Sequence, residues 1–316
     1  MDKPILTVTL NPALDLTIIC NALLLDSVNV ARECSLHAAG KGINVARVLS
    51  DLGVKVNATG IFGSSNRQPF DDFFRNHPIE NHCHHISGDT RINVKVKDDK
   101  DQVTEINLPG LEPSSQELNK FRIQLLEIAE QSAWVVLAGS LPKAIPIDFY
   151  SLLIADLNQL GINVILDTSG AALISAVKSV PFLIKPNRFE LEQWCGEPVT
   201  SIDKEKSVVQ NLLNLGIQHI VVSDGRHGSR WYTHDVVWQA IPPKMNVVST
   251  VGAGDSLVAG IVYGLSQGWS PDQCLVQATA IAALAVTQIG VGIPHRNELE
   301  KIRSQVQLMK LNAGEQ

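Results

Sequence analysis

Short runs of apolar and largely β-branched residues recur along the chain, and the stretches between them carry apolar residues at helical spacing. Two of these stretches run into Gly53 and Gly161, and glycine commonly ends a helix. Strands that alternate with helices predict an α/β fold, with a doubly wound, mostly parallel sheet that has helices on both faces. The predicted strands are 5–10, 56–62, 134–138, 163–167, 182–185 and 219–223.

Residues 91–97 follow a different period, because polar and apolar side chains alternate strictly there. This alternation predicts a half-exposed antiparallel strand, which a turn at 98–101 would join to a second strand at 102–108. We expect a further strand at 27–34, and the three strands would form a small β-sheet lid. The lid would be contributed by residues from about 12–35 and 85–108.

A length of 316 residues suits two domains or one large domain with an insertion. No internal repeat or low-complexity linker is apparent, so we expect one domain that spans 1–316 and carries the lid as an insertion. Hydrophobic residues make up 45% of the chain and charged residues 18%, which is far from the charged, apolar-poor composition of disordered chains. Lys and Arg number 26 against 32 Asp and Glu, which leaves a net charge of −6 without a basic block. Nucleic acid and anionic membrane both favour a basic face, so we expect neither as a partner.

Cysteine usage and hydropathy bear on location. The five cysteines are odd in number, scattered and without a Cys-x-x-Cys pair, which predicts free thiols in a reducing compartment, the cytoplasm. The longest apolar stretch, 274–293, is interrupted by polar residues such as Gln277 and Thr287. A membrane-spanning helix needs about 20 predominantly apolar residues, so we predict a buried helix there instead.

A glycine-rich turn stands directly before a helical stretch at 249–256, with the sequence Ser-Thr-Val-Gly-Ala-Gly-Asp-Ser. Glycines let backbone amides converge, and the positive potential of a helix N-terminus favours an anion or a developing oxyanion. A carboxylate beside such a site repels phosphate, unless Asp255 accepts a proton from the hydroxyl that attacks the phosphate. Alternatively, Asp255 only stabilises the first turn of the helix.

A second glycine-rich turn, 39–44 (Ala-Gly-Lys-Gly-Ile-Asn), also opens a helix. It matches neither Gly-x-x-x-x-Gly-Lys-Ser/Thr nor Gly-x-Gly-x-x-Gly, the two standard nucleotide-binding loops. Lys41 and Asn44 suit sugar hydroxyls or a phosphate, although a plain strand-to-helix turn uses the same residue types. The loop 223–228 likewise suits either a nucleotide phosphate or a plain hairpin.

Polar residues follow several predicted strands, and in open α/β sheets ligands bind beyond the carboxyl ends of the strands. Asp15, Ser140 and Asp167 are such residues. Asn187 and Glu190 lie three residues apart at a helix start, where they would face a metal–water cluster or form a capping pair. The His-Cys-His-His run at 82–85 contains metal-ligand residue types, but neighbouring strand positions point to opposite faces, so we do not favour a metal site there.

Taken together, five motifs resemble the PfkB/ribokinase family of sugar kinases. The resemblance covers nearly the whole chain. It implies a Rossmann-like, ribokinase-like α/β fold with a β-sheet lid, ATP as phosphoryl donor, Mg²⁺ carried by the nucleotide, and a homodimer formed through the lids. The motifs occur in the family's order: 11–15 (Asn-Pro-Ala-Leu-Asp), 39–46 (Ala-Gly-Lys-Gly-Ile-Asn-Val-Ala), 139–142 (Gly-Ser-Leu-Pro), 185–190 (Lys-Pro-Asn-Arg-Phe-Glu) and 250–255 (Thr-Val-Gly-Ala-Gly-Asp).

Within that family, the segments 37–42, 90–95 and 282–286 are most similar to members that phosphorylate the 6-hydroxyl of fructose 1-phosphate. The resemblance then implies that Asp255 is the base that removes the proton from this hydroxyl, with the amides of 252–254 as the anion hole. The amides of the implied anion hole belong to Gly252, Ala253 and Gly254, and the implied sugar-binding residues are Asp15, Gly40, Asn44 and Ser140, with Lys41 and Arg91 on the sugar's existing phosphate. The implied ATP-binding residues are Lys185, Asn187, Ser223, Gly225, Gly228, Thr250, Gly252 and Gly254. Asn187 and Glu190 are implied to hold Mg²⁺ through water.

Two positions depart from the family pattern: the nucleotide loop has Asp224 where relatives commonly have leucine, and the turn after 140–142 has Ala144 in place of the usual glycine. A carboxylate near ATP phosphates is unfavourable unless it points away or pairs with Arg226. Other functions stay open: a kinase of the same fold acting on tagatose 6-phosphate or fructose 6-phosphate, and a non-catalytic sugar-phosphate sensor. A dinucleotide-dependent oxidoreductase also fits the α/β alternation, but no Gly-x-Gly-x-x-Gly follows the first strand.

Overall fold

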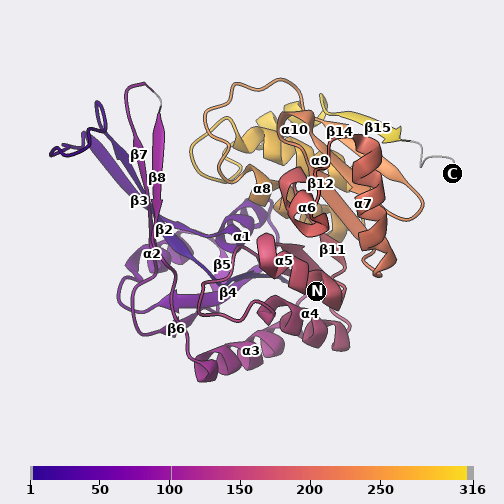
Figure 1. Ribbon diagram of the computed structural model, residues 1–316, viewed down its shortest axis with the longest axis horizontal. Helices are drawn as coiled ribbons and strands as arrows, with labels where there is room; N and C mark the ends of the chain where they lie inside the picture. The colour runs from indigo at the N-terminus through magenta and orange to yellow at the C-terminus, as the bar shows by residue number, and fades with distance from the viewer. Residues whose placement is uncertain (1–2, 101, 312–316) are drawn as a thin grey trace.

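The computed structural model describes residues 3–100 and 102–311 (Figure 1). Its main sheet has the strand order β15-β14-β13-β12-β11-β10-β9-β1-β4-β5, with β6 also paired to β4. The strands from β12 to β5 run parallel, and β13, β14 and β15 extend the β12 edge with antiparallel pairing. The strands are β1 (Ile5–Thr9), β4 (Val56–Gly63), β5 (Ile79–Asn81), β6 (His84–Ile86), β9 (Trp134–Ala138), β10 (Val164–Asp167), β11 (Leu183–Ile184), β12 (His219–Ser223), β13 (Ser229–Tyr232), β14 (Val237–Ile241) and β15 (Gln307–Leu311).

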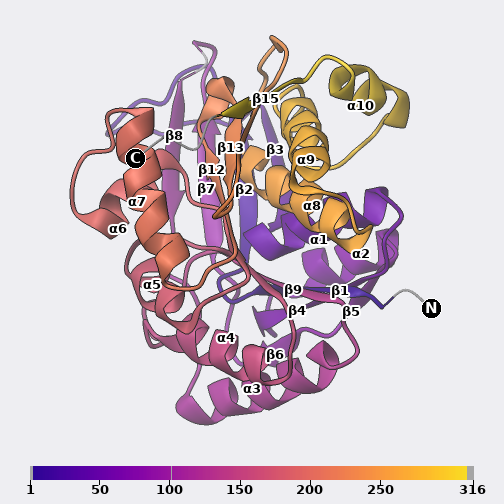
Figure 2. The ribbon, with the colours of Figure 1, turned by 90° about the vertical axis from the view of Figure 1, so that its right-hand side faces the viewer.

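Helices cover both faces of this sheet (Figure 2). On one face, helices such as α3 and α4 pack Phe121 and Leu153 against the strands, and on the other α8 and α9 pack Ile261 and Ile281. Because helices bury these strands on both faces, side chains on both sides of each strand are apolar, and the strand sequences are continuous apolar runs. The helices are α1 (Lys41–Asp51), α2 (Gln68–Asn76), α3 (Ser115–Ala129), α4 (Phe149–Gln159), α5 (Gly170–Ala176), α6 (Arg188–Cys195), α7 (Ile202–Asn214), α8 (Ala253–Ser266), α9 (Pro271–Ala285) and α10 (Arg296–Arg303), with short 3₁₀ turns at Val177–Ser179 and Gly225–His227.

A separate four-stranded sheet projects from the main sheet at the upper left of Figure 1. Its order is β3 (Glu33–Ala39), β2 (Ala13–Ile19), β7 (Ile92–Lys97) and β8 (Val103–Asn107). The two central strands, β2 and β7, run parallel, and each outer strand pairs antiparallel with its neighbour. We call this sheet the lid. Its base is fixed by Leu14 and Ile92, which pack with Phe62 and Phe70 of the main body.

The α/β fold and the lid hairpin predicted from the sequence are confirmed, whereas two element bounds were wrong. The strand expected at 27–34 lies at Glu33–Ala39, because the Asn29 side chain bonds both the N–H and the C=O of Leu24 and closes a loop before the strand. The helix expected at 274–293 ends at Ala285, and Gly290 and Gly292 then adopt positive φ. Part of the predicted turn, residue 101, lies outside the described residues.

The five cysteines are free thiols, as predicted. Among the described residues, no helix is long and apolar enough to cross a membrane.

Candidate active site

The polar residues that end or follow the parallel strands in the sequence lie together at the carboxyl ends of these strands. Asp167 ends β10, Lys185 directly follows β11, and Ser223 ends β12. Because these strands are parallel neighbours, their ends meet at one edge of the sheet. The site therefore lies at the edge that the strand-and-helix alternation predicted.

Asp255 occupies the first turn of α8, which begins without a side-chain cap. Gly252 stands before the helix with φ 81°, a left-handed conformation that glycine adopts without a steric penalty. Within the described chain, the backbone amides of Gly254 and Asp255 have no acceptor, so they stay available to an anion. The side chain of Asp255 is buried, and its Oδ2 accepts a hydrogen bond of 2.7 Å from Nδ2 of Asn44.

The bond from Asn44 to Asp255 joins the two glycine-rich turns of the sequence, because Asn44 lies in the first turn of α1. Gly40, with φ 137°, precedes α1, and this helix also begins without a side-chain cap. Two helix N-termini without a side-chain cap therefore meet at the bond between Asn44 and Asp255. Their positive potential favours an anionic ligand between them.

Burial, and then the nearby carboxylate of Asp167, raise the pKa of Asp255 to about 6. Lys41 and the bond from Asn44 act in the opposite direction. A carboxylate with this pKa is ionised at neutral pH, yet it is a stronger base than an exposed aspartate. This combination suits a group that accepts a proton during a reaction.

Asp167 holds two ammonium groups beside Asp255. Nζ of Lys41 and Nζ of Lys185 each lie 3.2 Å from a different oxygen of the Asp167 carboxylate. Burial alone would raise the pKa of Asp167, but the two lysines outweigh it and hold that pKa below its usual range. Lys41 thus lies on the Asp167 and Asp255 side of the site, where charge on a transferred group would develop.

On the lid side, Asp15 lies within β2 rather than in a loop after the first strand. Both of its carboxylate oxygens accept bonds from β7, one from Asn93 at 3.0 Å and one from Lys95 at 2.9 Å. The guanidinium of Arg91 donates to the carbonyls of residues 11 and 12 at 3.4 Å. Asn93 and Lys95 were not identified as site residues from the sequence, although the strict alternation had put them on the same face as Arg91.

Ser140 faces the same region, since its Oγ accepts a hydrogen bond of 3.0 Å from Nδ2 of Asn11. Asn11 lies between β1 and the lid, so this bond ties the loop after β9 to the base of the lid. The motifs 11–15 and 139–142, distant in the sequence, are therefore side by side.

The loop at 223–228 is the hairpin between the antiparallel strands β12 and β13. Gly225 and Gly228 both have positive φ, and any Cβ at Gly228 would collide with the carbonyl of Ala240. Asp224 does not pair with Arg226, which was one of the two arrangements that the sequence left open. Asp224 instead accepts bonds from Arg188 at 2.9 Å and from the buried Arg230 at 3.1 Å. Two guanidinium groups therefore offset this carboxylate in the loop.

Asn187 and Glu190 form the capping box that starts α6. The Asn187 side chain accepts from the Glu190 amide at 2.9 Å, and Oε2 of Glu190 accepts from the Asn187 amide at 2.8 Å. Within the described residues, the other carboxylate oxygen of Glu190 has no hydrogen-bond partner, and oxygen donors are the ligands that Mg²⁺ prefers. The pair therefore fits a nucleotide-bound Mg²⁺ held through water.

No group of three or more His, Cys, Asp or Glu side chains in the described chain is arranged to hold a metal ion, and this includes the 82–85 run.

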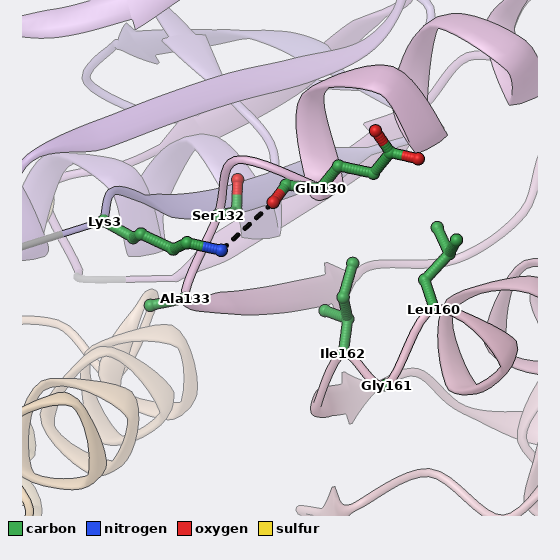
Figure 3. A pocket seen from close by; sticks show the side chains of 7 residues that line it. All are labelled: Lys3, Glu130, Ser132, Ala133, Leu160, Gly161 and Ile162. Atoms are coloured by element: carbon green, nitrogen blue, oxygen red, sulfur yellow. Dashed lines mark hydrogen bonds between the residues drawn. The ribbon is translucent and has the colours of Figure 1, made fainter.

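A cavity of about 440 Å³ lies at the opposite end of the sheet (Figure 3). Lys3, Ala133 and Ile162 line it, and these residues precede β1, β9 and β10. Ligands of open α/β sheets bind at the carboxyl ends of the strands, so this cavity is not part of the candidate site.

The α/β body, the β-sheet lid and the carboxylate at an uncapped helix N-terminus fit a kinase that phosphorylates a hydroxyl group. A family model described as "pfkB family carbohydrate kinase" matches residues 8–298, and the chain belongs to this family. The family inferred from the five sequence motifs is thereby confirmed.

Curated relatives named 1-phosphofructokinase align over almost their whole length. The protein from Vibrio cholerae serotype O1 is 42% identical over 312 residues, which cover 98% of each chain. The protein from Escherichia coli strain K12 is 39% identical over 312 residues, which cover 99% of this chain and 100% of the relative. Among solved structures, phosphofructokinase-2 from Escherichia coli in complex with fructose-6-phosphate is 26% identical, with a TM-score of 0.88 and coverage of 96% and 98%.

Proposed function

We propose that this protein transfers the γ-phosphoryl group of ATP to the 6-hydroxyl of fructose 1-phosphate, which yields fructose 1,6-bisphosphate and ADP. The observation that carries the proposal is the buried Asp255 at the uncapped start of α8, held by Asn44 from the second glycine-rich turn. A base beside free amides serves the transfer of an anionic group to a hydroxyl. The relatives named 1-phosphofructokinase support the choice of sugar.

In this mechanism Asp255 accepts the proton of the 6-hydroxyl while that oxygen bonds to the γ-phosphorus and the bond to ADP breaks. Amides at the start of α8, from Gly252, Ala253 and Gly254, would hold the phosphoryl oxygens. The Ala253 amide would first leave the Thr250 carbonyl, to which it donates at 3.4 Å. Lys41 and Lys185, fixed by Asp167, would offset the charge on the transferred group. Lys41 would therefore act on the transferred group rather than on the sugar's existing phosphate, and Arg91 is the residue proposed to bind that phosphate.

The residues proposed to bind the sugar, ATP and Mg²⁺ lie along the same edge of the sheet. The sugar would be held by Asp15, Gly40, Asn44 and Ser140. ATP would be bound by Asn187, Thr250 and the hairpin loop residues Ser223, Gly225 and Gly228. Mg²⁺ would neutralise nucleotide phosphate charge when bound, held through water by Asn187 and Glu190.

The substrate is tested by ADP release from the purified protein with Mg-ATP, comparing fructose 1-phosphate, fructose 6-phosphate and tagatose 6-phosphate at matched concentrations. We expect a kcat/KM preference of about 100-fold or more for fructose 1-phosphate. A preference for either 6-phosphate would keep the kinase but reverse the sugar's orientation, and so refute the proposed substrate. Binding without turnover of any sugar would instead support a sugar-phosphate sensor.

The acid limb of the pH profile reports on Asp255. Its pKa is raised to about 6, and only the ionised form accepts a proton, so kcat/KM with the proposed sugar is expected to fall as the pH drops through 6. The nearby Asp167 is one cause of this raised pKa, so Asp167→Asn is expected to shift the limb to lower pH. The measurement is kcat/KM from pH 4.5 to 8 in both proteins. An acid limb that stays in place in Asp167→Asn would contradict this coupling.

Arg91→Ala is expected to raise the KM for fructose 1-phosphate by about 10- to 100-fold and to change kcat far less. The planar guanidinium binds two phosphate oxygens, and a charged hydrogen bond contributes about 1.5–3 kcal/mol. Initial rates over a sugar titration measure this effect. Arg75→Ala, on the exposed face of α2, is the control variant and should leave KM unchanged. An unchanged KM in Arg91→Ala would remove this residue from the phosphate site.

We also propose a homodimer in the cytoplasm, formed through the apolar face of the lid. Leu36 of β3 and Ile106 of β8 belong to this face, and their exposed fractions are 43% and 57%, respectively. Covering such a face on a second lid removes it from water. Sedimentation of the wild type should give twice the chain mass, and the double variant Leu36→Glu and Ile106→Glu should give one chain mass. A monomeric wild type, or a double variant that stays dimeric, would contradict the proposal.

A further inference from the structure

The lid carries a charge pair, Asp15 and Lys95, of which the proposed function has used only Asp15. Asp15 of β2 has both carboxylate oxygens engaged by the neighbouring strand β7, Oδ1 by the amide of Asn93 and Oδ2 by the ammonium of Lys95. The side chains of Lys95 and Asp15 are only 18% and 22% exposed, so water screens this pair less than a surface ion pair.

The register of the lid explains why both donors reach one carboxylate. Asp15 lies directly opposite Asn93 across the parallel pair of β2 and β7, and Lys95 is two residues further along β7. Side chains two positions apart lie on the same face of a strand. Asn93 and Lys95 therefore fix the direction of Asp15 and offset its charge from the same strand.

The other charged groups of the site show why this offset matters. Lys41 and Lys185 are held by Asp167, and Arg91 donates to backbone carbonyls. Asp255 and Glu190 add two more carboxylates to the same end of the sheet. A sugar phosphate brings a further negative charge of about −1.5 to −2 at neutral pH. Without Lys95, Asp15 would be offset only by the guanidinium of Arg91, whose charge is also needed for the phosphate. Its carboxylate would then repel that ligand, even though its oxygens suit the sugar hydroxyls.

We infer that Lys95 neutralises Asp15, so that the carboxylate binds sugar hydroxyls without repelling the sugar's phosphate, and that this pair makes the site selective for phosphorylated over unphosphorylated sugars. Lys95 is a positioning and specificity residue that acts through Asp15 and does not itself bind the phosphate. The inference rests on the proposed function for the class of sugar. A wild type without turnover would count against that function, whereas the experiment below concerns differences between variants of an active enzyme.

A double-mutant cycle tests the inference with Lys95→Met, Asp15→Asn and the combined variant. Lys95→Met is expected to raise the KM for fructose 1-phosphate by about tenfold, because Asp15 is then offset only by Arg91, whose charge is also needed for the phosphate. In the Asp15→Asn background the same change should have almost no effect, since no charge is left to neutralise. An equal penalty in both backgrounds would overturn the inference and show that Lys95 contacts the phosphate directly.

Two further measurements separate this role from a purely structural one. Unphosphorylated fructose, used as a competitive ligand, should lose much less affinity than fructose 1-phosphate in Lys95→Met, because Asn93 still holds the Asp15 carboxylate. Lys95→Arg keeps the charge and should restore most of the KM, and Lys178→Met, at an exposed lysine far from the lid, should change neither constant. Equal losses of affinity for fructose and for fructose 1-phosphate in Lys95→Met would contradict the proposed selectivity.

Discussion

Asp255→Asn is expected to lower kcat by about 10²- to 10⁴-fold while the affinity for fructose 1-phosphate stays close to that of the wild type. Asparagine has nearly the same shape as aspartate, and its Oδ1 can still accept the hydrogen bond from Asn44. Its amide cannot accept the proton of the attacking hydroxyl at neutral pH. The loss therefore falls on the chemical step. Steady-state kinetics gives kcat, and calorimetric titration of the sugar gives its affinity.

A matched control is Asp203→Asn, which also changes an aspartate in the first turn of a helix, but at the exposed start of α7. This variant should keep the wild-type kcat and KM. The role of Asp255 as base would be refuted by a variant that retains near-full turnover. It would also be refuted by a loss of sugar binding equal to the loss of kcat, because the residue would then act in binding rather than in proton transfer.

The sequence predicted the edge of the sheet where the site lies because each parallel strand is a buried apolar run that ends at a polar residue. Asp167 and Ser223 both mark such ends. The two glycine-rich turns were also recognisable, since the positive φ of Gly40 and Gly252 requires glycine. No local pattern indicates that Asn44 of one turn bonds Asp255 of the other, because the two residues are 211 positions apart in the sequence.

Errors arose where a side chain rather than a backbone pattern decides the structure. The bonds from Asn29 to Leu24 shift the start of β3, and nothing in the hydropathy of 27–34 indicates them. For Asp224 the sequence offered either a pairing with its neighbour Arg226 or an orientation away from the loop, but it pairs with Arg188 and Arg230, which approach it from α6 and β13. The alternation of 91–97 placed Lys95 on the correct face, yet only the register of β2 against β7 brings it to Asp15.

Arg230→Met is expected to lower the free energy of unfolding by about 3–5 kcal/mol, the usual cost of leaving a buried charge without its partner. Glu205 of α7 is fully buried and accepts bonds from Nε of Arg230 at 2.6 Å, from its Nη2 at 2.7 Å and from the Tyr232 hydroxyl at 2.6 Å. Methionine fills a similar volume but leaves the Glu205 carboxylate with one donor. Urea denaturation, with the transition followed by circular dichroism, measures the change.

Arg122→Met is the matched control for this loss, because Arg122 also makes two bonds to one carboxylate, that of Asp156, but its side chain is 33% exposed. A pair this exposed contributes about 1 kcal/mol or less, so the control should be only slightly destabilised. Adding Glu205→Gln to Arg230→Met should recover part of the stability by removing the unpaired charge. Equal destabilisation by Arg230→Met and Arg122→Met would show that burial of the Arg230–Glu205 pair does not set its contribution. Because Arg230 also bonds Asp224, the destabilised variant should in addition bind ATP more weakly through a loosened nucleotide loop.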